Sequence, residues 1–443
     1  MKTPICDFVS AYADSGTVRM HMPGHKGLGK LLERLDITEI AGADSLFEAS
    51  GIIAESEKNA SEIFGSRTFY STEGSSLCIR AMVHLTVMYA KMMGEVPLIL
   101  AGRNAHKSFV SAIALTDCEL EWICADEGSL LSCVTDRAAV ERRLDELDRK
   151  PTAIYLTSPD YLGMVADIEE IAQLCHSRGI LLIVDNAHGA HLKFLEKSLH
   201  PIDLGADMCA DSAHKTLHAL TGAAYLHVSD NAPIELCKWA KDSLALFAST
   251  SPSYLILQSL DKLNATLDGD YVAKMTTFVD KIRILREKIA DLGYKTVSDD
   301  PMRITLLSKE FGYLGGELAE LMLDKKIAVE FSDDDHVVFM PSPDTTDEEL
   351  DILYDALASI ERRAKIEIAP CAVSLPKRAM SVRAAALSPH EYINVSEALG
   401  RVAGAITVGC PPAVPIVVSG EIIGKAEIEA LNYYKIEKIS AVK

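Results

Sequence analysis

The chain has 443 residues, of which 48% are hydrophobic and 24% are charged, a composition typical of a soluble globular protein with two or three domains. The formal net charge of −20 argues against nucleic-acid binding, because a phosphate backbone would be repelled. No apolar run is long enough to cross a membrane and no signal peptide is evident, so we expect a cytoplasmic protein. The ten cysteines lack paired metal-ligand spacing, so we expect reduced thiols and no metal site.

The N-terminal part of the chain predicts helices around a small-residue turn. Residues 1–18 are typical of a short amphipathic arm, and residues 52–64 carry apolar positions at helical spacing. A helix over residues 77–93 follows a turn of three small residues, Gly74, Ser75 and Ser76. Such a turn offers backbone N–H groups, hydroxyls and the positive end of the helix dipole to an anion. Ser75 is alternatively a simple helix N-cap, and the two roles can coexist.

Short apolar runs then alternate with helical segments. Residues 97–101 and 153–157 are predicted strands, and residues 180–185 form an aliphatic run that ends in Asp185. This alternation, continuing through Val228, predicts a doubly wound parallel sheet of the α/β class. Ligands bind at the carboxyl ends of the strands in such sheets, so Asp185 is expected to lie at a site.

A lysine occupies a second predicted strand end, in the motif Asp-Ser-Ala-His-Lys-Thr at residues 211–216. Most loop lysines are solvated surface charges, and alone Lys215 would be one of them. An acid and a lysine on neighbouring strand ends are, however, the two groups that hold pyridoxal 5'-phosphate (PLP). Lys215 would form the Schiff base, and Asp185 would pair with the pyridinium nitrogen.

These motifs resemble a known family. Val-Asp-Asn-Ala-His-Gly-Ala-His at residues 184–191, followed by Ser-Ala-His-Lys-Thr at residues 212–216, is similar to the ornithine/lysine/arginine decarboxylases. The resemblance covers nearly the whole chain and implies a PLP-dependent transferase-like fold (fold type I) with a mostly parallel sheet in the large domain. Larger members carry an extra N-terminal receiver-like domain, for which this chain has no room, so we expect the short form.

The resemblance also implies a domain organisation. Residues 1–285 would contain an N-terminal arm and the PLP-binding major domain, and residues 286–443 a C-terminal α+β region. Within that region we expect a small domain over residues 286–368 and a C-terminal decarboxylase domain over residues 369–443.

Site roles follow from the same resemblance. His106 would stack on the pyridine face, while Lys215 or His214 would take part in reprotonating the substrate Cα. His188 would lie beside the cofactor, although a core histidine is nearly as consistent with its position. The expected cofactor-binding residues are Gly74, Ser75, Ser76, His106, Asp185, Ala187, His188, Ser212, His214, Lys215, Thr250 and Ser251. The family's segment equivalent to residues 249–254 reaches the phosphate of the neighbouring subunit, which implies a homodimer or higher homo-oligomer with shared active sites.

Four positions depart from the family pattern. Glu73 stands where Asn is usual, and Cys410, Ala413 and Ser419 replace Tyr, Gly and Pro. An extra carboxylate beside a phosphate is unfavourable unless it points away.

The expected activity is PLP-dependent decarboxylation of a basic L-amino acid (arginine, lysine or ornithine) to the polyamine-type amine and CO2. Two alternatives stay open: aminotransfer or a lyase reaction on the same scaffold, and a non-catalytic PLP-binding paralogue. The presence of both Lys215 and Asp185 argues against the second.

Overall fold

The computed structural model describes residues 1–124, 131–133, 135–368, 375–406 and 414–443. Cys410 and Ala413 therefore lie outside the described residues. The chain divides into two compact units. The first comprises Met1–Pro97, Thr152–Ile154 and Ile168–Ala273, and the second comprises Leu98–Pro151, Tyr155–Asp167 and Lys274–Lys443. The domain boundaries expected after residues 285 and 368 stay predictions.

Seven strands are hydrogen-bonded in the order β1-β7-β6-β5-β4-β2-β3. Their bounds are Arg67–Ser71 (β1), Leu98–Gly102 (β2), Glu119–Ile123 (β3), Ala153–Thr157 (β4), Leu181–Asp185 (β5), Met208–Asp211 (β6) and Ala224–Val228 (β7). Neighbours β2 and β3 are parallel, as are β5 and β6. The predicted α/β fold with a mostly parallel sheet is confirmed.

The predicted parallel order is wrong at one edge of the sheet. Strand β7 runs antiparallel to both β6 and β1. The connection from β6 to β7 contains only the four-residue helix α7 (Ala213–Thr216). A parallel return needs a crossover, usually a full helix, so this short connection reverses the chain instead.

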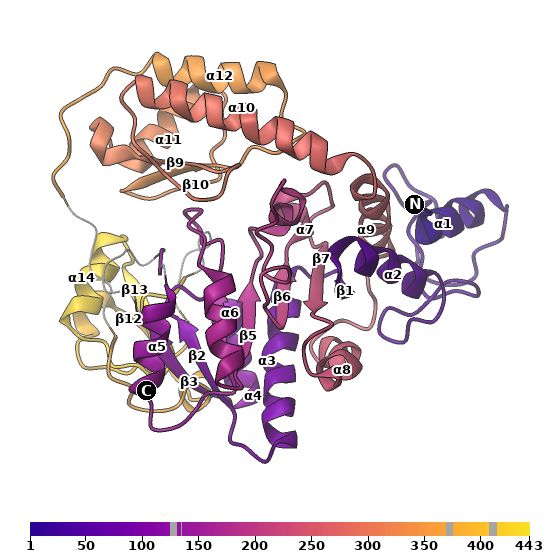
Figure 1. Cartoon of the computed structure of the whole chain (residues 1–443), viewed down its shortest axis with the longest axis horizontal. Coiled ribbons are helices and arrows are strands. Elements are labelled where there is room, and N and C mark those ends of the chain that lie inside the picture. The colour runs from indigo at the N-terminus through magenta and orange to yellow at the C-terminus, as the bar shows by residue number, and fades with distance from the viewer. Residues whose placement is uncertain (125–130, 134, 369–374, 407–413) are drawn as a thin grey trace. The chain divides into compact units, whose positions relative to one another are not determined.

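Helices of the first unit agree closely with the sequence patterns. The predicted helix at residues 52–64 is α2 (Ile52–Phe64), and the arm contains α1 (Pro4–Asp14). The helix after the small-residue turn is α3 (Ser75–Met92), which Figure 1 shows beside β6 and β7. The others are α6 (Ile168–Ser177), η1 (Ala190–Phe194), α8 (Ile234–Ala245) and α9 (Tyr254–Leu267).

An aromatic cluster fills the first unit's core behind β7. Phe64, at the end of α2, is fully buried. Its ring centroid lies 5.1 Å from that of Tyr225 and 4.5 Å from that of His227, both on β7, and 5.7 Å from that of Phe194 on η1. Tilted and edge-on ring pairs at such distances add to the free energy of burial. The core therefore contains the imidazole of His227 among aromatic rings. This polar group needs hydrogen-bond partners that offset the cost of its burial.

The second unit contains a four-stranded antiparallel sheet in the order β10-β11-β9-β8. Its strands are β8 (Thr296–Val297), β9 (Ile304–Leu307), β10 (Phe331–Ser332) and β11 (His336–Phe339). Figure 1 shows α10 (Tyr271–Asp291), α11 (Gly315–Asp324) and α12 (Asp347–Ala358) on one side of this sheet. A capping box at Thr346 and Glu349 begins α12. The remaining helical segments up to this point are α4 (Lys107–Thr116), α5 (Arg137–Asp145) and η2 (Ser308–Phe311).

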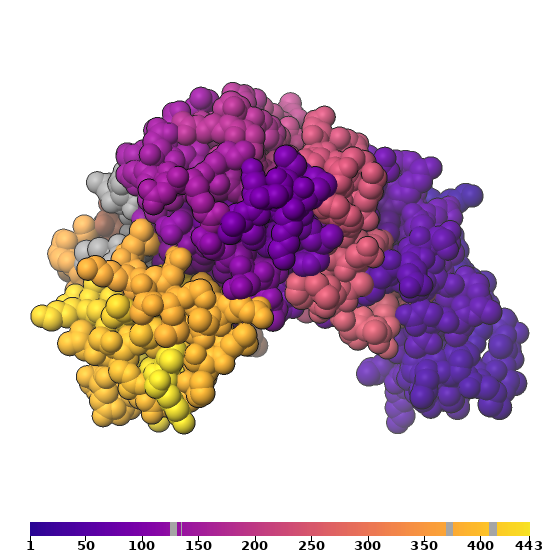
Figure 2. Space-filling view, turned by 90° about the horizontal axis from the view of Figure 1, so that it is seen from below, coloured from indigo at the N-terminus to yellow at the C-terminus, as the bar shows by residue number. Residues whose placement is uncertain are grey.

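The C-terminal residues of the second unit pack around their own apolar core. Strands β12 (His390–Asn394) and β13 (Lys438–Val442) pair antiparallel. Helices α13 (Val382–Ala386) and α14 (Lys425–Tyr433) and the short η3 (Val395–Glu397) accompany them. Figure 2 shows these residues, orange to yellow, gathered into one lobe. Its core includes Val395, Ala403, Ile423, Leu431 and Ile439.

A buried ion pair connects this lobe to the loop after β2. Arg103 and Glu421 are each 2% exposed, and Arg103 Nη2 donates to Glu421 Oε2 at 3.1 Å. The guanidinium also donates to the carbonyl oxygens of Pro415 (3.3 Å) and Ile416 (3.0 Å), and it lies over the ring of Trp122 at 4.9 Å. Burial raises the pKa of the Glu421 carboxyl, and the charge of Arg103 opposes that rise. Ser419, at one of the departures from the family pattern, is itself buried.

In the described part of the chain, no helix is both long enough and apolar enough to cross a membrane.

The Arg103–Glu421 pair generates a stability prediction. We expect Glu421→Gln to destabilise the protein by about 3 kcal/mol, because it leaves a buried guanidinium without a counter-charge. The matched control is Glu391→Gln, which removes an exposed partner of Arg401 and should cost less than about 1 kcal/mol. Urea unfolding followed by tryptophan fluorescence measures both. Equal midpoints for the two variants would contradict the assignment.

Candidate active site

The small-residue turn has the conformation of an anion-binding helix start. Gly74 has φ +72° and is the N-cap of α3, so the alternative that Ser75 caps this helix is wrong. The Gly74 N–H donates to the carbonyl oxygen of Gly222 at 2.8 Å. Among the described residues, no heavy atom lies within 4 Å of the place where a Cβ at Gly74 would be. The turn therefore has open space beside the helix N-terminus, where unpaired N–H groups bind anions.

The lysine segment is attached to this turn by a serine pair. Ser212, which follows β6, donates through Oγ to Ser75 Oγ at 2.8 Å, and both side chains are buried. The structure thus brings together two residues that are distant in the chain and were both predicted to bind the cofactor.

The carboxylate of Asp185 lies at the carboxyl end of β5, as predicted. It is 3% exposed, and its Oδ1 accepts the backbone N–H of Ala187 at 3.1 Å. Ala187 is also buried. A carboxylate at the end of a central strand, next to a small apolar residue, suits a partner for a ring nitrogen.

Lys215 lies in the one-turn helix α7 instead of the predicted irregular loop. Its Nζ is 2.8 Å from Nε2 of His188, which is 6% exposed. His188 follows Asp185 by three residues, so this contact brings the lysine amine to the carboxyl end of β5. His188 is therefore a buried histidine beside the lysine, and its place beside the cofactor stays a prediction.

His214 is held in a defined tautomer. Its Nδ1 lies 3.0 Å from the Ala223 carbonyl oxygen, which can only accept, so Nδ1 carries a proton. Burial lowers the pKa of His214, and the neighbouring charge of Lys215 lowers it further. The neutral ring therefore presents the lone pair of Nε2.

His106 belongs to the second unit, where it is the N-cap of α4. Its Nδ1 accepts the Ser108 N–H at 3.1 Å and lies 2.7 Å from Ser108 Oγ. The ring is thereby fixed in orientation, and its stacking on a cofactor stays a prediction.

Glu73 has a partner that the sequence did not reveal. Its Oε1 accepts the backbone N–H of Ser249 at 2.7 Å, and Ser249 Oγ in turn accepts the N–H of Ser251 at 3.2 Å. The segment that includes Thr250 and Ser251 is thus tied to the small-residue turn of its own chain. The sequence offered only the residue types as a signal, since these positions are far apart along the chain.

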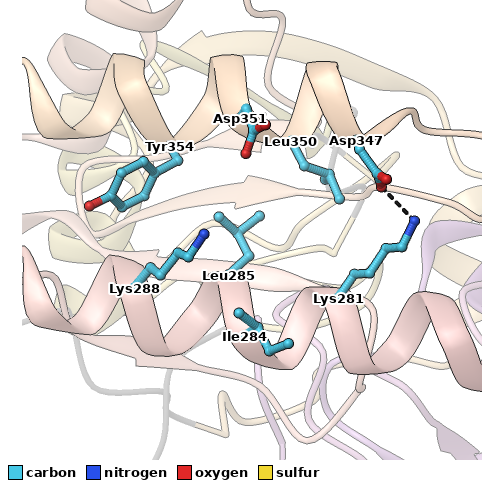
Figure 3. Close-up of a pocket in the computed structure, with 8 residues that line it drawn as sticks. All are labelled: Lys281, Ile284, Leu285, Lys288, Asp347, Leu350, Asp351 and Tyr354. Atoms are coloured by element: carbon cyan, nitrogen blue, oxygen red, sulfur yellow. Dashed lines mark hydrogen bonds and ion pairs between the residues drawn. The ribbon is translucent and has the colours of Figure 1, made fainter.

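A surface hollow between α10 and α12 lacks comparable chemistry (Figure 3). Lys281 pairs with Asp347 at 2.5 Å across it, and the Lys288 ammonium lies 5.7 Å from the Tyr354 ring centre. Two of its charged groups thus pair with each other, and we assign the hollow no function. The lining residues are Lys281, Ile284, Leu285, Lys288, Asp347, Leu350, Asp351 and Tyr354.

Comparison with solved structures defines the class of fold. The constitutive lysine decarboxylase of Escherichia coli superposes with a TM-score of 0.78 at 17% identity, over 100% of this chain and 82% of that one. A lysine decarboxylase of Pseudomonas aeruginosa gives 0.79 at 16% identity, over 99% and 80%. This likeness shows that the fold is that of the PLP-dependent fold-type-I enzymes.

Sequence comparison then identifies the family. The model of the Orn/Lys/Arg decarboxylase major domain matches residues 3–298, and that of the C-terminal domain matches residues 363–441. The chain belongs to this family of PLP-dependent amino-acid decarboxylases. An arginine decarboxylase of Halalkalibacterium halodurans is 30% identical over 96% of this chain and 92% of its own length. An arginine decarboxylase of Bacillus subtilis is 28% identical over the same shares.

The first unit fits the cofactor that the family implies. PLP has an aldehyde, a ring nitrogen and a phosphate. The first unit offers an amine on Lys215, a carboxylate on Asp185 and an open helix N-terminus at Gly74. The Ser212–Ser75 contact ties the lysine segment to that helix start. The three groups are therefore held by one framework.

A steric test of the turn follows from Gly222. This residue has φ +97°, and a Cβ on it would come within 2.9 Å of the Thr72 carbonyl oxygen. We expect Gly222→Ala to displace the turn at Gly74 and to weaken PLP binding at least about tenfold. This factor corresponds to the loss of one hydrogen bond to a charged group. Titration of the cofactor-free enzyme with PLP measures the dissociation constant.

Gly94→Ala is the control, because Gly94 also has positive φ, +74°, but open space around its Cβ. Circular dichroism checks that both variants are folded. Equal PLP affinities in the two variants would contradict a role of Gly222 in shaping the turn.

Proposed function

We propose that this chain decarboxylates a basic L-amino acid to the corresponding amine and CO2, with arginine as the first candidate. One observation carries the proposal: the amine of Lys215 meets His188 at the end of β5, while Ser212 of the same segment meets Ser75 at the start of α3. The choice of arginine is supported by the full-length relatives named as arginine decarboxylases.

The residues have separate roles in this proposal. Lys215 would provide the amine that holds the cofactor covalently. Asp185 keeps a proton on the ring nitrogen, since a carboxylate favours a positive charge next to it. The small-residue turn and Ser212 hold the phosphate. Bound PLP supplies an electron sink for the bond that breaks when CO2 leaves.

Two histidines handle protons around Lys215. His188 accepts a hydrogen bond from the protonated lysine and so fixes the direction of Nζ. His214 is neutral near pH 7 because its pKa is lowered, and its Nε2 is free of the Ala223 contact made by Nδ1. Lys215, or His214 once its Nε2 has taken up a proton, then returns a proton to the substrate Cα. His106 would cover the ring face, as the family resemblance implies.

A substrate panel tests the proposal. Purified enzyme with PLP would be given arginine, lysine and ornithine, and CO2 would be measured together with agmatine, cadaverine and putrescine. We expect agmatine and CO2 in equal amounts from arginine. Lys215→Ala should not form the borohydride-reducible PLP adduct. Its turnover should be at least about 10³-fold lower than that of the wild type, because the covalent attachment is gone.

Other products would decide against this chemistry. A keto acid formed without CO2 would indicate aminotransfer. A reducible adduct remaining in Lys215→Ala, after removal of carried-over cofactor, would show that the wrong lysine is assigned.

Assembly is a second part of the proposal. We expect a homodimer in which Thr250 and Ser251 of one subunit reach the phosphate site of the other. A doubly charged phosphate is best held by donors from several directions, and one helix start with Ser212 covers only part of that shell. The Ser249–Glu73 hydrogen bond within one chain supports the simpler alternative, in which the segment serves its own site.

A mixed dimer separates these alternatives. One subunit would carry Lys215→Ala and the other Thr250→Asp, each nearly inactive as a homodimer. A shared site gathers both lesions in one of the two sites and leaves the other intact, so activity should recover toward half of the wild-type value. No recovery, with heterodimers verified by mass, would favour the same-chain arrangement and refute the shared site.

A further inference from the structure

Four side chains of types that can bind a metal ion lie together in the core of the first unit. We call His200, Cys209, Asp211 and His227 the buried quartet. All four are buried, and their ligand atoms lie within 4.8 Å of one another. Such a gathering is costly unless the groups satisfy one another or share a ligand.

Strand geometry explains why the quartet converges. Cys209 and Asp211 are two residues apart on β6, so their side chains point to the same face of the sheet. His227 on β7 lies directly opposite Cys209 in the antiparallel register. His200 arrives from the segment between η1 and β6. Phe64 covers the group, with its ring centroid 4.5 Å from that of His227 and 5.7 Å from that of His200.

The distances suit four ligands around one small ion. Asp211 Oδ2 lies 3.1 Å from His200 Nε2 and 3.3 Å from His227 Nε2, and Cys209 Sγ lies 3.8 Å from His200 Nε2. Around tetrahedral zinc, with bonds of about 2.0–2.3 Å, neighbouring ligand atoms are separated by about 3.3–3.7 Å. The remaining pairs of ligand atoms lie within 4.8 Å of one another, so the quartet would contract around the ion to complete such a shell.

We propose that the buried quartet is a structural Zn²⁺ site, with one imidazole nitrogen from each histidine, the Cys209 thiolate and the Asp211 carboxylate as ligands. Mixed nitrogen and sulfur ligands in a closed tetrahedral site select zinc over magnesium or calcium. The thiolate and the carboxylate neutralise the two positive charges of the ion. The site therefore carries no net charge in an environment closed to solvent.

Outer partners orient the ligands as they do in known metal sites. Nδ1 of His227 lies 2.9 Å from Thr68 Oγ1, and Asn186 Nδ2 donates to Asp211 Oδ1 at 2.6 Å, the oxygen that does not face the histidines. His200 is engaged on one side only: its Nδ1 is buried without a hydrogen-bond partner in the structure, while Nε2 faces Asp211. The ring is thus fully enclosed and directed into the quartet.

A second group of potential metal ligands already has a positive charge beside it. Asp333, Asp335 and His336 also lie together, but the ammonium of Lys309 is 2.7 Å from Asp335 and already supplies a positive charge. Among the described residues, no lysine or arginine is recorded in an ion pair with Asp211, the acid of the quartet. Within the part of the chain that the structure describes, the two imidazoles are therefore the only possible cationic partners of the quartet's carboxylate.

The proposed ion lies under the catalytic segment. Asp211 directly precedes Ser212, and α7 with Lys215 follows. An ion that binds β6, β7 and the segment before β6 would fix the base of this segment without touching a substrate.

Metal analysis of the wild-type holoenzyme tests the proposal. The untagged protein would be produced with zinc in the medium and passed over a chelating resin. We expect close to one zinc ion per chain by mass spectrometry. The zinc X-ray absorption spectrum should show one sulfur near 2.3 Å and nitrogen or oxygen ligands near 2.0 Å. This readout needs no variant that has to fold.

Variants identify the ligands. Cys209→Ser and His200→Gln should lower zinc affinity at least about tenfold in competition with a chromophoric chelator. Cys175→Ser is the control, because Cys175 is a buried cysteine on α6 in the same unit and outside the quartet. Wild-type protein that loses its zinc on the resin, or a spectrum with nitrogen and oxygen ligands only, would overturn the proposal. The quartet would then be a metal-free hydrogen-bonded cluster.

Discussion

The arrangement of the active site depends on one buried hydrogen bond between Asn186 and Asp211. Asn186 Nδ2 donates to Asp211 Oδ1 at 2.6 Å, and the Asn186 backbone N–H donates to the Ala210 carbonyl oxygen at 3.0 Å. Both side chains are closed to solvent, where an unpaired carboxylate would cost several kcal/mol. Asn186 follows the acid at the end of β5, and Asp211 precedes the lysine segment. This contact therefore fixes the two chemical groups relative to each other, and it exists because two parallel strands end side by side.

The chain reverses its direction after α7, and this reversal connects the lysine segment to the small-residue turn. A crossover helix in place of α7 would have carried the chain away from the site. The short connection instead returns it at once, so that Gly222, just before β7, accepts a hydrogen bond from Gly74. Ser212, at the beginning of the connection, meets Ser75. The feature that makes the parallel-sheet prediction wrong at this edge thus also brings Gly222 and Ser212 to the small-residue turn.

The sequence predicted what depends on local pattern. Helical periodicity located α2, the aliphatic run located the strand that ends in Asp185, and the motif around Lys215 identified the candidate cofactor lysine. Long-range pairing was not predictable in the same way. The partner of Glu73 lies at Ser249, and the buried quartet is assembled by strand register instead of ligand spacing. Our expectation of no metal site rested on the lack of paired cysteine spacing and stays a prediction. The zinc site proposed above is an alternative to it, in which a strand pair and a distant segment would supply the ligands.

Glu73 and Ser419, the two departures from the family pattern that lie among the described residues, take no part in the Asn186–Asp211 and Ser212–Ser75 hydrogen bonds. A carboxylate near a phosphate site raises the cost of binding the phosphate unless its charge is directed elsewhere. Glu73 is directed elsewhere, because its Oε1 accepts the N–H of Ser249. Ser419 is buried two residues before Glu421, and Glu421 keeps its pair with Arg103, so the end of the C-terminal element is anchored despite the loss of the usual proline. The contacts that hold the cofactor groups and those that anchor the C-terminal element therefore involve different residues.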